Sequence, residues 1–495
     1  MRARVLPPAS LGVVLAVVLA TLAGCNTVGP DYKRPALALD ASFVGAGASA
    51  LDVRPPAADI ASFWRGFGDP KLDALIERAV VANGDVRLAQ ARLLEARASQ
   101  DEADAAWRPG VGIDTGATRS IRPITQQPGS SRSARTGTSF DANFLASWEI
   151  DLFGRLRRGS EAAEALSAAG QANVHAAQTS VAAEVARNYL ELRGLQQRLR
   201  FTEASLMNQR ESLRITRARV DAGRGTQLDL ARAQTLVSST EAASPALQTA
   251  VERTIFRLAT LTAQTPRALL ADLAQASPLP GLPVTDLAKL PAGTPELWLQ
   301  RRPDLIAAER QLAASTALIG VARAELYPRL SLSGLLGLNA STLSNLVKGE
   351  SARYSLGAGL IWTPFDLGAI RSRIRASEAR AQQSLAGFEQ VVAVALEETE
   401  GAFSSYTRSA QRAEKLEAAA RSADEAAGLA RARYEAGVTD FLAVLDAERE
   451  ALNIRDQFVQ AQVGTATALV AVYRALGGGW SAPAVSASIR STDSP

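Results

Sequence analysis

Two stretches of this chain, Gly154 to Gly223 and Gly368 to Gly437, each separate their bounding glycines by 69 residues and contain no proline. Both are rich in Ala, Leu, Arg, Glu and Gln, which are strong helix formers. At a rise of about 1.5 Å per residue, each would form a helix roughly 100 Å long, far beyond the few turns of an ordinary globular helix. We therefore expect a chain that bridges a distance.

The long stretches belong to a unit that occurs twice. Asp85 lies 24 residues before Pro109, and Asp304 lies 24 residues before Pro328; in each half a tryptophan then precedes the first glycine of the long stretch by six residues. We expect each half to contain a helix, two strands, the long helix and a returning helix. The expected ranges are 71–107, 111–118, 139–148, 154–223 and 226–262 in the first half, and 304–326, 330–338, 354–362, 369–436 and 441–476 in the second.

The expected strands have one apolar face, because apolar residues alternate with small or polar ones along them with a period of two. The apolar sets are Phe140, Ala142, Phe144, Ala146 and Trp148, and Tyr354, Leu356, Ala358, Leu360 and Trp362. Four strands cannot close a barrel in a membrane, whereas three copies would supply twelve, an even number in the range of outer-membrane barrels. The alternative is a soluble four-stranded sheet covered by helices.

The first long stretch also carries a heptad repeat. Apolar residues recur at every seventh position: Val185, Leu192, Leu199, Leu206, Leu213 and Val220. A strict heptad is typical of a left-handed coiled-coil seam. The expected fold class is therefore mainly α with a transmembrane β-barrel: a duplicated unit of long coiled-coil helices, with four strands per protomer that form a 12-stranded barrel in a homotrimer.

Residues 1–24 have the pattern of a secretory signal peptide. A basic start is followed by an apolar run, Leu11 to Ala23, which is too short to span a bilayer. Two small residues then precede Cys25, the only cysteine, in a pattern that resembles a bacterial lipoprotein signal. The resemblance implies that Cys25 becomes the first mature residue and carries S-diacylglycerol and N-palmitoyl chains. Asn26, in place of an aspartate that favours inner-membrane retention, indicates the outer membrane. The alternative is an ordinary leader with a leftover thiol.

Prolines divide the remaining chain. Residues 25–70 contain five prolines and are expected to form an extended, lipid-anchored tether rather than a packed element. Residues 264–303 contain seven prolines and form a connection between the first repeat, 71–263, and the second, 304–476. We expect residues 477–495 to be a flexible tail.

Signals of enzymatic chemistry are absent from the sequence. His175 is the only histidine and Cys25 the only cysteine, which excludes a Cys/His metal centre. No P-loop, Gly-x-Ser-x-Gly or dinucleotide fingerprint occurs. The formal charge is +4, and the acidic and basic residues are interspersed along the chain. The sequence therefore has no basic cluster of the kind that binds nucleic acid. We expect no catalytic residue, no metal and no cofactor besides the covalent lipid, and we expect His175 to be a surface or seam residue.

Four motifs mark the chain in order: Cys25-Asn26-Thr27-Val28-Gly29-Pro30-Asp31-Tyr32, Phe63-Trp64 with Phe67-Gly68-Asp69-Pro70, Arg301-Arg302-Pro303-Asp304-Leu305, and Tyr434-Glu435-Ala436-Gly437. They resemble the outer-membrane factor lipoproteins of tripartite efflux pumps, the TolC-like, NodT-type family, over essentially the whole mature chain. The resemblance implies a homotrimer with its barrel in the outer membrane and a helical tunnel across the periplasm. It also implies two partners, a periplasmic adaptor protein and an inner-membrane resistance-nodulation-division transporter.

The turns that follow the two long helices hold the candidate docking residues. Gly223 and Gly437 suit the left-handed position that ends a helix, and Thr226 and Asp440 are N-cap residue types. Two tight helix hairpins alone would explain these residues. The resemblance places both turns at the periplasmic tip and implies contacts to the adaptor by Arg219, Gly223, Thr226, Arg433, Gly437 and Thr439.

Leu442 and Asp446 lie one helical turn apart, just after the second turn. In the family that the chain resembles, a leucine and an aspartate at this spacing form constriction rings, which makes these residues the candidate periplasmic gate. Three Asp446 carboxylates near a threefold axis would repel one another and favour cations. Alternatively, Leu442 is a seam residue and Asp446 a solvated or Arg-paired acid. The first repeat has Leu228 and Arg232 at the corresponding positions.

The expected function is a passive channel that exports small molecules such as drugs and toxic compounds. The inner-membrane partner would supply the energy, and docking of the adaptor would untwist the helices at the tip. The alternatives are the same fold in heavy-metal efflux or type I protein secretion, and a periplasmic structural lipoprotein without a pore.

Overall fold

The computed structural model describes residues 27–37, 39–40, 42–44, 62–282, 296 and 301–479. The expected signal peptide, Cys25 and residues 480–495 of the expected tail lie outside the described residues. The chain divides into two compact units. Unit 1 contains Met1–Pro35, Leu93–Gly170 and Ala308–Phe388, and unit 2 contains Ala36–Arg92, Gln171–Ala307 and Glu389–Pro495. Both repeats contribute to both units, because each long helix passes from one unit to the other.

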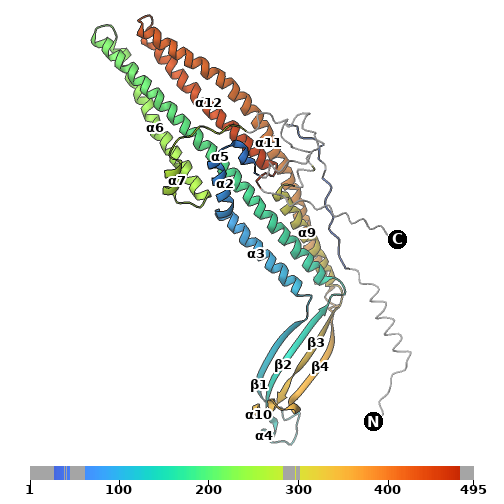
Figure 1. The fold of residues 1–495 in the computed structure, drawn as a ribbon. Helices are drawn as coiled ribbons and strands as arrows, with labels where there is room; N and C mark the ends of the chain where they lie inside the picture. Colours follow the sequence, from blue (N-terminus) through green and yellow to red (C-terminus); the bar gives the residue numbers. More distant parts are fainter. Residues whose placement is uncertain are drawn as a thin grey trace, which may run out of the picture. The chain divides into compact units, whose positions relative to one another are not determined.

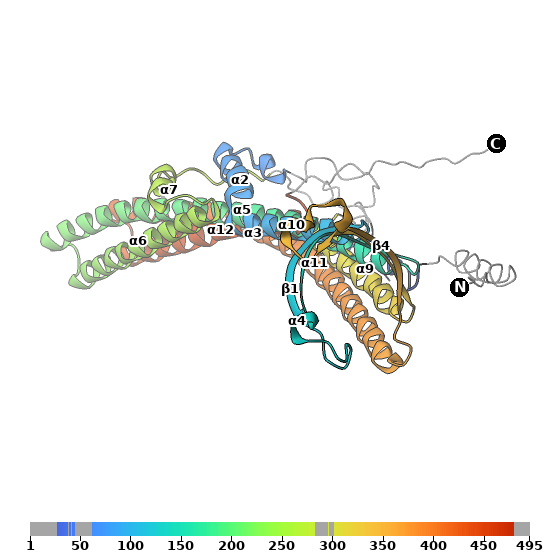
Figure 2. The ribbon, with the colours of Figure 1, turned by 90° about the horizontal axis from the view of Figure 1, so that it is seen from below.

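Unit 1 contains a four-stranded antiparallel sheet in the order β1-β2-β3-β4 (Figure 1). The strands are β1 (Gly110–Ile121), β2 (Thr136–Ile150), β3 (Arg329–Ala340) and β4 (Ala352–Ile361). Each repeat supplies two neighbouring strands, as expected. Figure 2 shows the sheet as a curved band with β1 and β4 at its edges. Within the described residues, each of these edge strands pairs on one side only.

The pairing register places the apolar residues of the four strands on one face. In one row Ile113 pairs with Phe144, Phe144 with Leu336, and Leu336 with Tyr354. These four side chains are 72%, 57%, 63% and 81% exposed in the same order. A contiguous apolar surface of this kind marks a membrane or protein contact. The predicted apolar face is therefore confirmed.

The opposite face of the sheet is polar and internally hydrogen-bonded. Arg353 Nη2 donates to Asp141 Oδ1 at 3.0 Å and to Asn143 Oδ1 at 3.0 Å. Asn339 Nδ2 donates to the same Asp141 oxygen at 2.6 Å. This network connects β2, β3 and β4 without using the apolar face.

Two tryptophans fix the ends of β2 and β4 in the same way. Trp148 Nε1 donates to the carbonyl of Trp107 at 2.9 Å, and Trp362 Nε1 donates to the carbonyl of Leu326 at 3.1 Å. Each acceptor lies two residues before the proline that follows the preceding helix, α3 (Gly84–Ala105) or α9 (Pro303–Ala324). The duplication is therefore visible in side-chain geometry as well as in spacing.

The long helices are present as predicted. They are α5 (Arg155–Asp221, 67 residues) and α11 (Leu367–Glu435, 69 residues), and the returning helices are α6 (Gln227–Leu261) and α12 (Phe441–Ala475). Figure 1 shows α6 running back along α5 and α12 along α11. Of the predicted heptad seam, Val185 and Leu192 are fully buried and the other four residues are half-buried.

The expected single helix over 71–107 is wrong, because the chain forms two helices, α2 (Pro70–Ala82) and α3. Asn83 separates them with an extended ψ of 141°. Its Oδ1 accepts a hydrogen bond from Asp85 N at 2.8 Å, and its Nδ2 donates to the carbonyl of Leu261 at 2.9 Å. An asparagine side chain that caps the following turn competes with continued helix.

The start of the expected tether is extended but packed in unit 1. Arg158 of α5 donates through Nη2 to Asp31 Oδ1 at 2.6 Å and through Nε to the carbonyl of Val28 at 3.3 Å. Gly29 (φ +102°) lies directly against Gly320 of α9, where neither residue has room for a Cβ. This segment has neither helix nor strand, as expected, whereas the expectation that it is not packed is wrong.

Tyr32 continues this attachment. Its hydroxyl donates to Glu309 Oε1 at 3.1 Å. Burial, together with the Glu309 carboxylate, raises the pKa of Tyr32 to about 12, so the hydroxyl keeps its proton at neutral pH.

Other expected linker segments are also ordered, in unit 2. Phe63, in the short 3-10 helix η3 (Phe63–Phe67), stacks on Tyr473 with ring centroids 4.9 Å apart. The proline-rich connection contains α7 (Pro266–Leu273). Gly477, at the start of the expected flexible tail, is buried and donates to the carbonyl of Arg474 at 3.0 Å. Local burial of aromatic and small residues explains why these segments differ from the expectation.

Helix α9 is, among the described residues, the one helix long and apolar enough to cross a bilayer. Half of the window that meets this test is buried inside the protein. Ala314 and Ala317 of α9 pack against Ala162 of α5 in a small-residue contact. These features are those of a helix in a protein core.

Candidate functional site

The turns that join α5 to α6 and α11 to α12 share one backbone geometry. Gly223 and Gly437 have left-handed φ values of +71° and +75°. Each turn closes with a bond from the second residue of the turn back to the helix: Arg224 N donates to the carbonyl of Arg219 at 2.8 Å, and Val438 N to that of Arg433 at 2.9 Å. This closure is the Schellman motif, in which glycine meets the least strain.

Both returning helices are capped by the residues that the sequence indicates. Thr226 and Asp229 form a reciprocal capping box, with Asp229 N donating to Thr226 Oγ1 at 3.1 Å. Asp440 Oδ1 accepts from Ala443 N at 3.2 Å. The hairpin explanation of these residues is therefore correct. Their contact with an adaptor stays a prediction.

Arg219 joins the two hairpins to each other. Its Nη2 donates to the carbonyls of Tyr434 at 2.6 Å and Glu435 at 3.1 Å, at the end of α11. Its guanidinium carbon also lies 4.1 Å from the centre of the Tyr434 ring. A cation is favourable at a helix C-terminus, where carbonyls lack helical partners. The predicted docking residue Arg219 thus already has an intramolecular role.

A small apolar core lies beneath this link, and Tyr434 and Phe441 are its centre, with rings 5.5 Å apart edge to face. Its buried members are Ala233, Leu236, Tyr434, Phe441, Val444 and Leu445. The core belongs to α6, α11 and α12, so it holds both hairpins together.

The predicted gate residues lie outside this core. Leu442 is 40% exposed and Asp446 is exposed, and neither belongs to the apolar cluster. In the first repeat, the corresponding Leu228 is 58% exposed and Arg232 is half-buried. The protomer therefore leaves the Leu442 and Asp446 side of α12 uncovered. The gate assignment stays a prediction.

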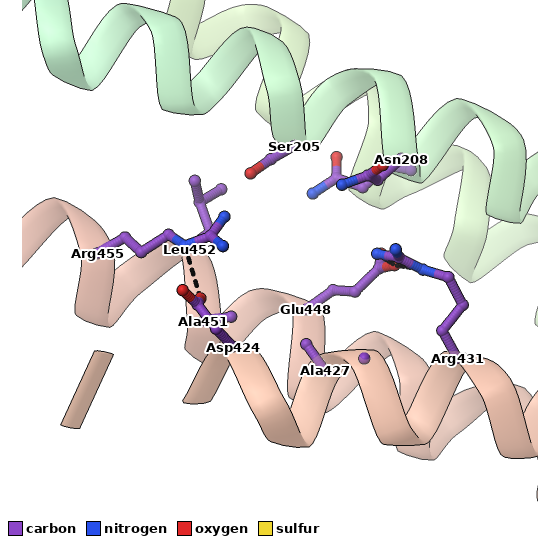
Figure 3. A pocket seen from close by; sticks show the side chains of 11 residues that line it. Ser205, Asn208, Asp424, Ala427, Arg431, Glu448, Ala451, Leu452 and Arg455 are labelled. Atoms are coloured by element: carbon purple, nitrogen blue, oxygen red, sulfur yellow. Dashed lines mark hydrogen bonds and ion pairs between the residues drawn. The ribbon is translucent and has the colours of Figure 1, made fainter. Parts of the chain in front are cut away.

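A polar cavity of about 120 Å³ lies farther along the hairpins, between α5 on one side and α11 and α12 on the other (Figure 3). Glu448 is 7% exposed, and its Oε1 accepts from Arg431 Nη2 at 2.8 Å and from Ser212 Oγ at 3.3 Å. Glu448 Oε2 and both amide atoms of the buried Gln209 have no protein partner among the described residues. Polar cavities of this size typically hold ordered water. The seam is therefore apolar near the turns and polar here.

Arg433, Thr439 and His175 are the other residues that the sequence singled out. Arg433 is exposed in the last turn of α11, and Thr439 is half-buried just before the Asp440 cap. His175 is half-buried on α5, with Nε2 3.1 Å from Gln171 Nε2 and Nδ1 3.3 Å from Gln178 Oε1. Among the described residues, no cluster of His, Cys, Asp and Glu could hold a metal ion.

The sequence reasoning missed Tyr434, Arg431 and Glu448 as parts of the site. A signal for them does exist on α5, where Gln209, Ser212 and Thr216 follow one another at helical spacing. Ser212 bonds Glu448, and Thr216 Oγ1 lies 3.2 Å from the Tyr434 hydroxyl. A polar stripe beside a leucine seam indicates polar partners on the facing helix.

A sheet with an exposed apolar face, together with paired helices of this length, defines the class of outer-membrane channel proteins. A model of the outer membrane efflux protein family matches residues 75–264 and 294–478, which is most of the chain. The chain belongs to this family and is an outer-membrane efflux channel.

Relatives of known name agree with this assignment. The chain is 33% identical over 425 residues to the pyoverdine export outer membrane protein OpmQ of Pseudomonas putida, covering 85% of this chain and 88% of OpmQ. It is 32% identical over 474 residues to outer membrane protein OprJ of Pseudomonas aeruginosa, covering 95% of this chain and 96% of OprJ.

Solved structures show the same fold. The outer-membrane channel OprN matches with a TM-score of 0.84 and 40% identity, covering 92% of this chain and all of that one. The open state of the MtrE outer membrane channel of Neisseria gonorrhoeae matches with a TM-score of 0.78 and 27% identity, covering 92% of this chain and 99% of MtrE. The predicted family, fold class and outer-membrane location are therefore confirmed.

Proposed function

We propose that this channel works as a passive homotrimer, the outer-membrane component of a tripartite pump that exports small molecules. The observation that carries the proposal is the sheet, which has an exposed apolar face and two edge strands, β1 and β4, that each pair on one side only within the part of the chain that the structure describes. An open edge in a bilayer leaves backbone groups without partners. Pairing β1 of one copy with β4 of the next satisfies both edges, and three copies close a 12-stranded barrel.

The names of the relatives support small organic molecules as cargo. OpmQ is named for pyoverdine export, and further relatives are named as outer membrane proteins of solvent, toluene and antibiotic efflux pumps. Relatives of one fold that carry different cargoes are consistent with a channel in which the pump selects the substrate. The inner-membrane partner is a resistance-nodulation-division transporter, and a periplasmic adaptor connects the two.

The adaptor binds the two turns, through Arg219, Gly223, Thr226, Arg433, Gly437 and Thr439. Four of these residues are exposed, and Arg219 and Thr439 are half-buried. Arg219 bonds the end of α11. An adaptor that contacts Arg219 would disturb these bonds, and their loss would allow the two hairpins to separate. The resting gate is formed by Leu442 and Asp446. Cys25 carries the diacylglycerol and palmitoyl chains that anchor the protein to the membrane.

The test is the mass and the channel activity of the purified full-length protein. We expect a trimer in detergent and discrete conductance steps in planar bilayers. A monomer without conductance would support the structural lipoprotein, the alternative without a pore. A matched sample of the Cys25→Ala variant should still form conducting trimers while losing the lipid mass.

A further inference from the structure

The loop between β1 and β2 is strongly basic. Between residues 115 and 140 the chain has no aspartate or glutamate and four arginines: Arg119, Arg122, Arg132 and Arg135. The equivalent stretch of β3, β4 and their loop, residues 334–356, has one lysine, one arginine and one glutamate, a net charge of +1 against +4. Because the duplication does not repeat this charge, it is not a requirement of the fold. We call Arg119, near the end of β1, together with Arg122 and Arg132 of the adjoining loop, the basic loop.

The charges of the basic loop are not used inside the protomer. Among the described residues, none of its three arginines forms an ion pair, and all three are exposed. The half-buried Arg135 holds the loop closed, since its Nη1 donates to the carbonyl of Arg122 at 2.8 Å. On the polar face of the same sheet, by contrast, Arg353 is paired with Asp141 at 3.0 Å.

The basic loop lies at the end of the sheet away from the tryptophans. Gly110 pairs with Ser147, so the next residue of β2, Trp148, lies level with residue 109. Residue 109 is ten positions from Arg119 along the chain. Ten residues of strand span about 33 Å, which a barrel tilt of about 40° reduces to roughly 25 Å of membrane height. This is the height of the apolar band in outer-membrane barrels. Trp148 and Arg119 therefore lie at the two borders of the apolar band.

The register also decides which side of the sheet Arg119 is on. Strand residues alternate between faces, so Arg119 shares the apolar, outward face with Val111 and Ile113 rather than the polar face of Arg353. An arginine on the outward face contacts lipid. An arginine that binds exported anions would instead lie on the polar face, which lines the channel. Arginine also binds phosphate oxygens in a planar, two-point geometry, and its methylene stem can lie along apolar chains.

We propose that the basic loop binds the phosphate groups of phosphorylated lipids in the outer leaflet. The inference rests on the proposed function, because the helices must be periplasmic for the β1–β2 loop to face outward. Arg119 binds at the border of the apolar band, and Arg122 and Arg132 bind the same headgroup layer from the loop above it. In the trimer this gives one basic loop per protomer around the rim of the barrel.

The test measures binding of lipid A to the purified full-length protein in non-ionic detergent by native mass spectrometry. Lipid A with two phosphates is compared with the same lipid after enzymatic dephosphorylation, and inorganic phosphate is added as a competitor. We expect wild-type protein to prefer the phosphorylated form at least tenfold, since each cation near an anionic headgroup contributes about a fivefold factor. The variant Arg119→Gln, Arg122→Gln, Arg132→Gln should lose this preference.

A matched control is Arg87→Gln, Arg92→Gln, Arg371→Gln, which removes the same charge from exposed arginines on helices. It should keep the wild-type preference. Equal binding of both lipid forms by wild-type protein overturns the proposal, as does a wild-type preference in the loop variant. Full competition by inorganic phosphate at the lipid's own concentration would show an anion site without a lipid component, which also overturns it. Planar-bilayer conductance of all three proteins reports separately on the channel function.

Discussion

At the residue scale, the second hairpin carries two neighbours with different environments. Phe441 is buried in the core that joins the hairpins, whereas Leu442 is exposed on the next face of α12. Among the described residues, Asp446 has neither a hydrogen bond nor an ion pair. An apolar and an acidic side chain left uncovered in one protomer are consistent with rings formed by three.

The first prediction concerns these two residues. The double variant Leu442→Ala, Asp446→Ala should raise single-channel conductance in planar bilayers several-fold, because it removes the two rings of side chains that narrow the bore. The matched control is Leu228→Ala, Arg232→Ala at the corresponding positions of the first repeat, which should conduct as wild type. Unchanged conductance in the first variant would defeat the gate assignment.

The second prediction concerns Arg219. Arg219→Lys keeps the charge but loses the planar group that bonds two carbonyls and stacks on Tyr434. The link between the hairpins should weaken by about 1 kcal/mol. Amide hydrogen exchange at Gly437 and Val438, whose N–H groups bond the end of α11, should then become roughly fivefold faster, since exchange follows the local opening free energy.

The control for this experiment is Arg433→Lys, because Arg433 is exposed and takes part in the turn through its backbone carbonyl. Its exchange rates should equal those of wild type. Wild-type rates in Arg219→Lys would show that the bonds at 2.6 and 3.1 Å do not hold the hairpins together.

Local chemistry was enough to predict the turn residues. Gly223, Thr226 and Gly437 serve their own backbone, so their roles follow from residues within a few positions. The role of Arg219 could not be predicted in the same way, since its partner Tyr434 lies 215 residues away. Which residues meet across the hairpins depends on the alignment of α5 with α11, and sequence periodicity fixes a face but not an alignment.

At the scale of elements, the longest helices and the amphipathic strands were the most predictable parts, because their patterns extend over many residues. The break at Asn83 was missed, since its single side chain caps α3 inside a run that is otherwise helical. The packing of the N-terminal segment was missed for another reason. It depends on Gly29 meeting Gly320, and two glycines far apart in the sequence give no local signal of contact.

The third prediction tests that contact. In Gly320→Ala, the new Cβ would lie 2.6 Å from Arg158 Cγ and 2.8 Å from the carbonyl oxygen of Val28. Overpacking of this kind typically costs about 1–3 kcal/mol. We expect the N-terminal segment to detach and trypsin to cleave after Lys33 much faster, as measured by mass spectrometry of limited digests.

Gly437→Ala provides the comparison, because nothing lies within 4 Å of its added Cβ and only the left-handed φ of +75° is strained. The expected cost is about 1 kcal/mol at the turn. Cleavage after Lys33 should stay at the wild-type rate in this variant. Equal cleavage of the two alanine variants would mean that the glycine pair does not hold the segment.

At the scale of the whole molecule, function follows from surfaces that a single protomer leaves unsatisfied. The apolar face of the sheet needs lipid, its two edge strands need neighbouring strands, and the uncovered side of α12 suits a symmetric bore. The sequence predicted the apolar face, since alternation is a local pattern. The sequence also predicted that four strands leave open edges, but which strands form those edges became visible only with the strand order.

The fourth prediction separates the two faces of the sheet with adjacent residues of β4. Tyr354 is 81% exposed and pairs with Leu336 on the apolar face, whereas Ser355 pairs with Leu335 on the opposite face. An arginine on the lipid side of a barrel costs about 2–4 kcal/mol near the bilayer midplane, and Tyr354 lies level with Ile113, near the middle of the apolar band. Tyr354→Arg should therefore lower the amount of trimer recovered from outer membranes. Ser355→Arg adds the same charge to the interior, so its trimer should assemble normally and conduct with reduced cation preference. Equal recovery of both variants, with equal ion selectivity, would contradict the assignment of the apolar face to lipid.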